Sequence, residues 1–231
     1  MQNIVLNIPH SSTQGIFDNK IGGWTPNPHF INDCVNRWTD WWTDMLFHSN
    51  NEKVKPFVFP YSRFVCDVER LENDPLEEQG QGILYTSFNG YKRKELSIET
   101  NDKLFKIRSE YLNDICNSLT CDSVLLDCHS FPSDLSDVDI CIGFNDDWSY
   151  NEKITDCVID TFRRHGYKVG INTPYSNSLT PEFEVRYASL MIEVNKKVYM
   201  NENNMTLNRN QRQWMRWDGC IEEIYNKIIS L

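Results

Sequence analysis

The sequence predicts an α/β protein in which a largely parallel or mixed β-sheet is covered by helices. Short apolar runs of strand length alternate along the chain with longer segments of helical periodicity. Some of the short runs are apolar at every position, which is typical of strands covered on both faces. With 231 residues the chain can bury one sizeable core, so we expect a single domain over residues 1–231.

Six apolar runs are expected to form the strands of this sheet. They span residues 4–9, 54–60, 123–128, 139–144, 167–172 and 189–195. Apolar side chains at helical spacing predict helices over 31–47, 101–119, 149–166 and a last segment around 220–228.

The third of these helices carries its own start and stop signals. Ser149 and Glu152 form a capping-box pattern, and Gly166 ends the segment. Before the second helix, residues 70–96 are polar and contain glycines. Excursions of that length are usually functional loops.

Composition excludes several classes of function. The formal net charge of −10 argues against a nucleic-acid partner, which would favour a basic face. No apolar run approaches the roughly 20 residues that cross a bilayer, so we expect a soluble, cytoplasmic protein without a membrane partner. The eight cysteines include no CxxC pair and several lie in apolar runs, which favours buried, reduced thiols.

Three strands carry polar side chains at or near their carboxyl ends, where open α/β sheets bind ligands. His10 and His129 follow the first and third strands, and Glu193 lies in the last. Two imidazoles and a carboxylate form a three-ligand metal site with an open position for water. The alternative is that each histidine is a hydrogen-bonded cap at its strand end.

Glu193 lies between apolar neighbours, where a carboxylate is costly to bury unless it is paired or used. It is either a general base or an exposed position on an edge strand. Another apolar run is followed by Arg63, Asp67 and Arg70. The guanidinium groups of the two arginines suit carboxylate binding and oxyanion stabilisation. The alternative is that Arg63 and Asp67 simply form an ion pair with each other. Asp40 lies on a charged helical stripe, which is usually a solvated face.

Six segments in this order resemble the N-formylglutamate amidohydrolase (deformylase) family. They are PHSS (9–12), TDWW (39–42), SRFVCDVER (62–70), LLDCHS (125–130), GYKVGINTPYS (166–176) and MIEVNKKVYM (191–200). The resemblance runs from about residue 5 to residue 202. It implies a three-layer α/β/α sandwich with a mixed, mostly parallel sheet, of the kind found in zinc carboxypeptidases.

The resemblance also implies a metal-dependent hydrolase that cleaves an amide bond, most simply with one zinc ion. His10 and His129 look like metal ligands, and Asp40 matches an acidic position that would complete the metal shell. Glu193 looks like the catalytic carboxylate, which takes a proton from a zinc-activated water and passes it to the leaving amine. Histidine and carboxylate ligands also suit iron, manganese or nickel.

The substrate implied is a small acyl amino acid such as N-formylglutamate, or a short peptide. Arg63 looks like the group that polarises the scissile carbonyl, and Arg70 like the group that holds a substrate carboxylate, with Asp67 as their orienter. Asn172 and Tyr175, in the fifth segment, are expected to contact the substrate.

The chain departs from the family pattern at several positions around this expected site. Ser12 stands for a glycine, Glu69 for an asparagine and Cys116 for a histidine, while Lys196 or Lys197 stands for an arginine. These departures support the reaction class more than the substrate. A zinc peptidase or γ-glutamyl hydrolase is therefore the alternative enzyme, and a metal-free binding protein is the alternative from another class.

Overall fold

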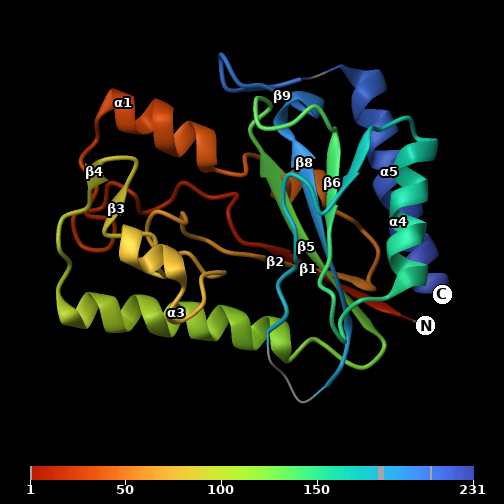
Figure 1. Cartoon of the computed structure of the whole chain (residues 1–231), viewed down its shortest axis with the longest axis horizontal. Coiled ribbons are helices and arrows are strands. Elements are labelled where there is room, and N and C mark those ends of the chain that lie inside the picture. The colour runs from red at the N-terminus through yellow and green to blue at the C-terminus, as the bar shows by residue number, and fades with distance from the viewer. Residues whose placement is uncertain (1, 182–184, 209) are drawn as a thin grey trace. The chain divides into compact units, whose positions relative to one another are not determined.

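The computed structural model describes residues 2–181, 185–208 and 210–231 (Figure 1). Its contacts divide the chain into two compact units. The sheet unit comprises Met1–Ile8, Trp42–Phe57 and Ile115–Leu231, and the aromatic unit comprises Pro9–Trp41 and Val58–Asp114. The expectation of one domain over the whole chain stays a prediction.

The sheet unit is built on a six-stranded sheet, and all six expected strands are confirmed. The strands are β1 (Asn3–Ile8), β2 (Val54–Val58), β5 (Ser123–Phe131), β6 (Ile140–Gly143), β7 (Val169–Ile171) and β8 (Ala188–Asn195). Their order across the sheet is β2-β1-β5-β8-β6-β7. β1 pairs with β5, β5 with β8 and β6 with β7 in parallel, whereas β6 and β8 are antiparallel. The predicted mixed, mostly parallel α/β fold is therefore confirmed.

The continuously apolar runs form the centre of the sheet. Every residue of β5 is buried, and so is every residue of β8 after Ala188. Covering both faces of a strand removes the need for alternating polar positions, which explains the sequence pattern. It also means that the polar residues within these two strands are held away from bulk water.

Two helices, α4 (Glu152–Arg164) and α5 (Gln211–Ser230), lie side by side against the sheet (Figure 1). The Trp217 indole and the Tyr225 hydroxyl of α5 donate hydrogen bonds to the carbonyls of Leu46 and Phe47, at 2.7 and 2.9 Å. These carbonyls belong to the end of the short helix α2 (Thr43–Leu46) and the residue after it. The sheet unit is completed by the 3-10 turn η3 (Lys196–Val198) and the hairpin of β9 (Met200–Asn201) and β10 (Thr206–Leu207).

The aromatic unit contains little regular structure and is held by stacked rings. Its elements are α1 (Pro28–Phe30), the π-helix η1 (Ile31–Asn36), the 3-10 helix η2 (Pro75–Gln79), the hairpin of β3 (Ser87–Phe88) and β4 (Tyr91–Lys92), and most of α3 (Ile98–Cys116). Its core is a cluster of buried side chains: Ile16, Trp24, Phe30, Cys34, Val35, Phe64, Tyr85 and Phe88. Five of these eight side chains are Trp, Phe or Tyr, so ring geometry rather than a ladder of strands fixes this unit.

The continuous helix expected over 31–47 is wrong. The carbonyl of Asn36, which would accept the Asp40 amide in an α-helix, instead accepts the Trp41 indole at 2.9 Å. The Asp40 amide donates to the carbonyl of His10 at 3.0 Å, and Trp42 adopts the left-handed conformation with φ of 58°. A contact between distant segments therefore overrides the local helical pattern and presents Asp40 outside any helix.

Two smaller expectations also change. His129 lies inside β5, which continues to Phe131, so the strand does not end at the histidine. The cap of α4 is Asn151, whose side chain accepts from the amide of Ile154 at 3.2 Å. Ser149 instead donates to Asp147 at 2.6 Å.

All eight cysteines are free and six of them are buried, while their reduced state stays a prediction. Burial raises the pKa of Cys34 to about 11 and those of Cys66 and Cys220 to about 12, with smaller contributions from Asp33, Asp67 and Glu223. Cys121 is the exposed one of the eight. Separately, no helix among the described residues is both long enough and apolar enough to cross a membrane.

The cap of α4 gives a test of the fold. Replacing Asn151 with alanine should lower the free energy of unfolding by about 1 kcal/mol, because the Ile154 amide loses its acceptor. Urea unfolding of Lys153→Ala, an exposed change in the same turn, should differ from wild type by less than about 0.5 kcal/mol. Equal stabilities of the two variants would contradict the assignment of this cap.

Candidate functional site

His10 lies two residues after the end of β1 and is the first candidate site residue of the aromatic unit along the chain. It is 3% exposed, and its Nε2 lies 2.9 Å from Oδ1 of Asp67. Asp67 belongs to the segment that carries both expected arginines and is 1% exposed. The pair therefore joins two segments of this unit that are far apart in sequence.

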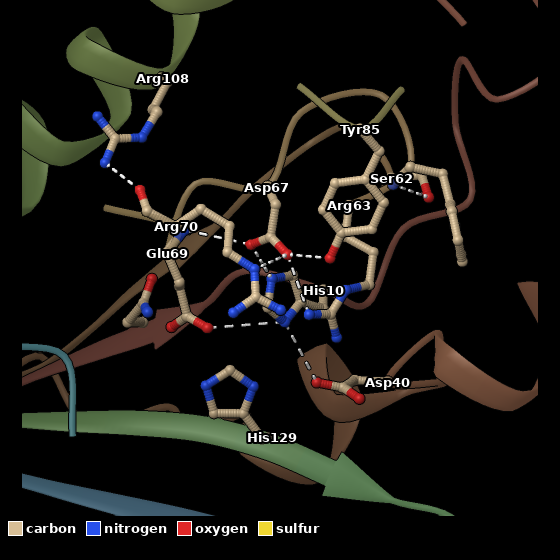
Figure 2. Close-up of polar contacts among 12 residues, drawn as sticks. His10, Asp40, Ser62, Arg63, Asp67, Glu69, Arg70, Tyr85, Arg108 and His129 are labelled. Carbon is tan, nitrogen blue, oxygen red and sulfur yellow. Dashed lines mark hydrogen bonds and ion pairs between the residues drawn. The ribbon is translucent and has the colours of Figure 1, made fainter. Parts of the chain in front are cut away.

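The Asp67 carboxylate accepts hydrogen bonds at both oxygens (Figure 2). Oδ2 accepts from Nη2 of Arg63 at 3.0 Å and from the hydroxyl of Tyr85 at 2.7 Å. Oδ1, besides facing His10, accepts from the amide of Glu69 at 3.3 Å. Burial by itself raises the pKa of this carboxyl, but the charge of Arg63 and the hydrogen bond from His10 outweigh it and hold the pKa well below its usual range.

An ionised Asp67 decides which nitrogen of His10 carries the proton. A carboxylate without a proton only accepts, so Nε2 of His10 must donate, and in the neutral ring Nδ1 then holds the lone pair. Nδ1 lies 3.7 Å from Oε2 of Glu69 and 3.8 Å from Oδ2 of Asp40. Two ligands of one tetrahedral zinc ion are about 3.4 Å apart, so either carboxylate stands at a suitable distance.

Arg63 and Arg70 flank the same carboxylate. Nε of Arg70 lies 3.7 Å from Oδ2 of Asp67, and its Nη1 lies 3.7 Å from Asp74. Burial alone lowers the pKa of Arg63, yet Tyr85 and Asp67 raise it well above its ordinary value. From α3, Arg108 donates to the backbone carbonyl of Arg70 at 2.6 Å and so fixes the loop that carries it.

The sheet unit repeats the arrangement found at His10. Nε2 of His129 lies 3.0 Å from Oδ1 of Asp127, two residues earlier on the same strand and the same face. Asp127 also accepts from the side-chain amide of Asn7 at 2.8 Å and from the backbone amide of Leu179 at 2.9 Å. When Asp127 is the acceptor in this contact, Nε2 of His129 is the nitrogen that carries the proton.

Glu193 is the lateral neighbour of His129 in the sheet. The register of β5 and β8 places the two residues opposite each other, and laterally paired side chains point to the same face. Glu193 is 8% exposed and β8 lies between β5 and β6, so the alternative of an exposed edge position is wrong. A buried carboxylate beside a buried imidazole is a suitable setting for proton transfer.

The remaining expected substrate contacts have local roles in the sheet unit. Asn172 adopts the left-handed conformation with φ of 50°, and its side-chain oxygen accepts from the amide of Phe144 at 3.0 Å. The carbonyl of Tyr175 accepts from the Cys141 thiol at 3.2 Å. Whether either side chain also contacts a substrate stays a prediction.

Two residues of this site were not assigned a role from the sequence. In the sequence Glu69 stands out only as a departure from the family pattern, because it lies in a turn where no periodicity relates it to His10. Tyr85 lies in the polar excursion and carried no signal, since its partner Asp67 is 18 residues away.

Comparison with known proteins gives two kinds of match. The family model described as N-formylglutamate amidohydrolase matches residues 2–200. The crystal structure of N-formylglutamate amidohydrolase from Ralstonia eutropha JMP134 is similar with a TM-score of 0.78 and 19% identity, covering 98% of this chain and 94% of that one. The structure of gene product Atu2144 from Agrobacterium tumefaciens gives 0.64 and 15%, covering 99% and 89%. No curated protein matches the sequence.

The buried carboxylate of Asp67 gives a test by pH. Replacing Asp67 with asparagine should lower the free energy of unfolding at pH 7 by about 3 kcal/mol, because Arg63 loses its buried partner. The depressed pKa of Asp67 means that its stabilising contribution is present above the unfolded pKa of about 3.9 and is lost as the pH falls toward the folded value.

The difference between wild type and Asp67→Asn should therefore shrink by about 1 kcal/mol between pH 7 and pH 3 in urea unfolding. Asp33→Asn, at an exposed carboxylate of the same unit, should show neither effect. A difference that stays constant with pH would contradict an ionised, low-pKa Asp67.

Proposed function

Because the chain belongs to the N-formylglutamate amidohydrolase family, and is thus a hydrolase of the amidohydrolase class, we propose that it cleaves the amide bond of a small N-acyl amino acid of the N-formylglutamate type with the help of one zinc ion. One observation carries the proposal. His10 and His129 each direct Nε2 to a buried carboxylate, the contact that orients metal-ligating histidines.

The donor set fits a divalent metal. His10, Glu69 and His129 would hold the ion, with Asp40 as the other carboxylate beside Nδ1 of His10. Imidazole and carboxylate ligands, each oriented by a hydrogen-bonded partner, are the usual set of catalytic zinc sites.

Chain connectivity supports joining the two histidines at one ion. Asn7 of β1 pairs with Asp127 of β5, and β1 ends one residue later. Only Pro9 separates Ile8 from His10, so the Cα of His10 lies within about 7.6 Å of the strand's last residue. His129 is likewise two residues beyond Asp127. Covalent geometry thus keeps the Cα atom of His10 near the end of β1, the strand that pairs with the one carrying His129.

A zinc ion, when bound, supplies a more acidic water and polarises a carbonyl oxygen. The proton transfers belong to Glu193. Its carboxylate takes a proton from the attacking water as the bond from water oxygen to acyl carbon forms, and gives that proton to the nitrogen as the carbon–nitrogen bond breaks. The products are a carboxylate and a free amino acid.

Arg63 and Arg70 supply positive charge for the substrate. Both guanidinium groups keep a raised pKa beside Asp67, so both are charged at neutral pH. Arg63 would stabilise the developing oxyanion, and Arg70 would pair with a substrate carboxylate. Against a net charge of −10, such a local cation pair is what an anionic substrate requires.

Three proteins test the proposal together: wild type, Glu193→Gln and His129→Ala. Metal content is measured by elemental analysis, and turnover by amine release from a panel of N-acyl amino acids and glutamyl peptides. Glu193→Gln should keep stoichiometric zinc and lose at least about 100-fold in kcat, because the amide cannot accept the proton. His129→Ala should lose the zinc itself.

His29→Ala, at an exposed histidine, is the control and should keep both zinc and turnover. Wild-type turnover in Glu193→Gln would remove that residue as the base. Activity on glutamyl peptides alone would replace the substrate class with that of a peptidase. Absence of recoverable zinc in wild type would favour a metal-free binding protein.

The two carboxylates beside His10 give a sharper test of the ligand set. Glu69→Gln should weaken zinc binding by more than about tenfold, whereas Asp40→Asn should weaken it less, if Glu69 is the ligand. The measurement is competition with a chelator of known zinc affinity at pH 7. The opposite order would assign the ligand to Asp40.

A further inference from the structure

Both the ring and the backbone of Tyr85 are fixed by contacts within the aromatic unit. Its ring stacks on Phe88, with centroids 5.7 Å apart and an angle of 3° between planes, and meets the edge of Phe64 at 5.9 Å. Its backbone carbonyl accepts from Nη1 of Arg93 at 3.2 Å. Arg93 also donates to the carbonyls of Ile21 and Gly22 at 2.6 and 2.5 Å, so the loop that carries Tyr85 is held to a segment distant in sequence.

The hydroxyl of Tyr85 is an uncharged donor to the Asp67 carboxylate. It donates to Oδ2 at 2.7 Å, the oxygen that also accepts from Arg63 (Figure 2). Burial raises the pKa of Tyr85, so the hydroxyl keeps its proton and remains a donor. An aromatic core position would be filled equally well by phenylalanine, and the hydroxyl therefore needs its own explanation.

We propose that Tyr85 is a positioning residue for the metal site: its hydroxyl fixes the rotation of the Asp67 carboxylate, and through it the ring orientation of His10 and the place of the Arg63 guanidinium. This inference rests on the proposed function of the site.

The two oxygens of the Asp67 carboxylate have different hydrogen-bond partners, which explains why the Tyr85 hydroxyl is needed. Oδ1 is used by His10 and by the amide of Glu69, and Oδ2 by Arg63 and Tyr85. Arg63 is half-buried on a long, flexible side chain, whereas Tyr85 is 1% exposed on a stacked ring. The rigid donor sets the carboxylate plane, and the flexible one follows it.

The test compares Tyr85→Phe with Tyr91→Phe. Both keep the ring, and Tyr91 packs on the same cluster with its hydroxyl 3.4 Å from Oδ2 of the exposed Asp33. Three quantities are measured: the ring ¹⁵N chemical shifts of His10 without metal, the zinc dissociation constant by chelator competition, and kcat and KM on the best substrate of the panel.

Tyr85→Phe should change the His10 ¹⁵N shifts from those of a single Nε2–H tautomer toward a mixture. It should also weaken zinc binding by about tenfold or more and lower kcat by a larger factor than it raises KM. Tyr91→Phe should match wild type in all three. Because Phe retains the stack on Phe88, the near-ultraviolet circular dichroism of both variants should match wild type.

Wild-type ¹⁵N shifts and zinc affinity in Tyr85→Phe would overturn the inference, since the hydroxyl would then serve the core alone. The experiment distinguishes failure of the proposed function from failure of the proposed role of Tyr85. If wild-type protein neither binds zinc nor cleaves the panel, the proposed function fails, and the His10 shifts of the metal-free protein still decide the role of Tyr85.

Discussion

The aromatic unit depends on one buried carboxylate. Asp67 is ionised with almost no access to water, and an ion in that position is tolerated only when its oxygens are fully hydrogen-bonded. His10, Arg63 and Tyr85 meet this requirement from three separate segments. Satisfying one charge therefore fixes a possible metal ligand, a cation and an aromatic core residue at once, which is how a unit with so little regular structure holds a defined site.

The sheet unit solves the same problem with strands. Asp127 accepts from Asn7 on the adjacent strand and from Leu179, and it orients His129 two residues along β5. Here the register of the sheet replaces ring packing as the source of rigidity. The two imidazoles thus present the same nitrogen by different structural means, and Glu193 is placed beside His129 by strand pairing alone.

The sequence made the sheet predictable because buried parallel strands are apolar at every position, a signal that survives without any knowledge of partners. It also identified His10, His129 and Glu193 as candidate site residues, since each is a polar residue at the end of an apolar run or inside one. The helix over 31–47 could not be predicted correctly, because the Asp40 amide bonds to His10, a residue 30 positions away. The roles of Tyr85 and Glu69 were hidden for the same reason: each contact joins loop residues that follow no period.

The eight free thiols bear on which metal the proposed site would take. Zinc coordinates a thiolate and not a thiol, so cysteines whose pKa lies near 11 or 12 do not compete for it at neutral pH. The donors of the proposed site are imidazole and carboxylate groups, and these discriminate weakly among first-row metals. The cellular supply of zinc, iron, manganese or nickel would then determine occupancy more than any preference built into the fold.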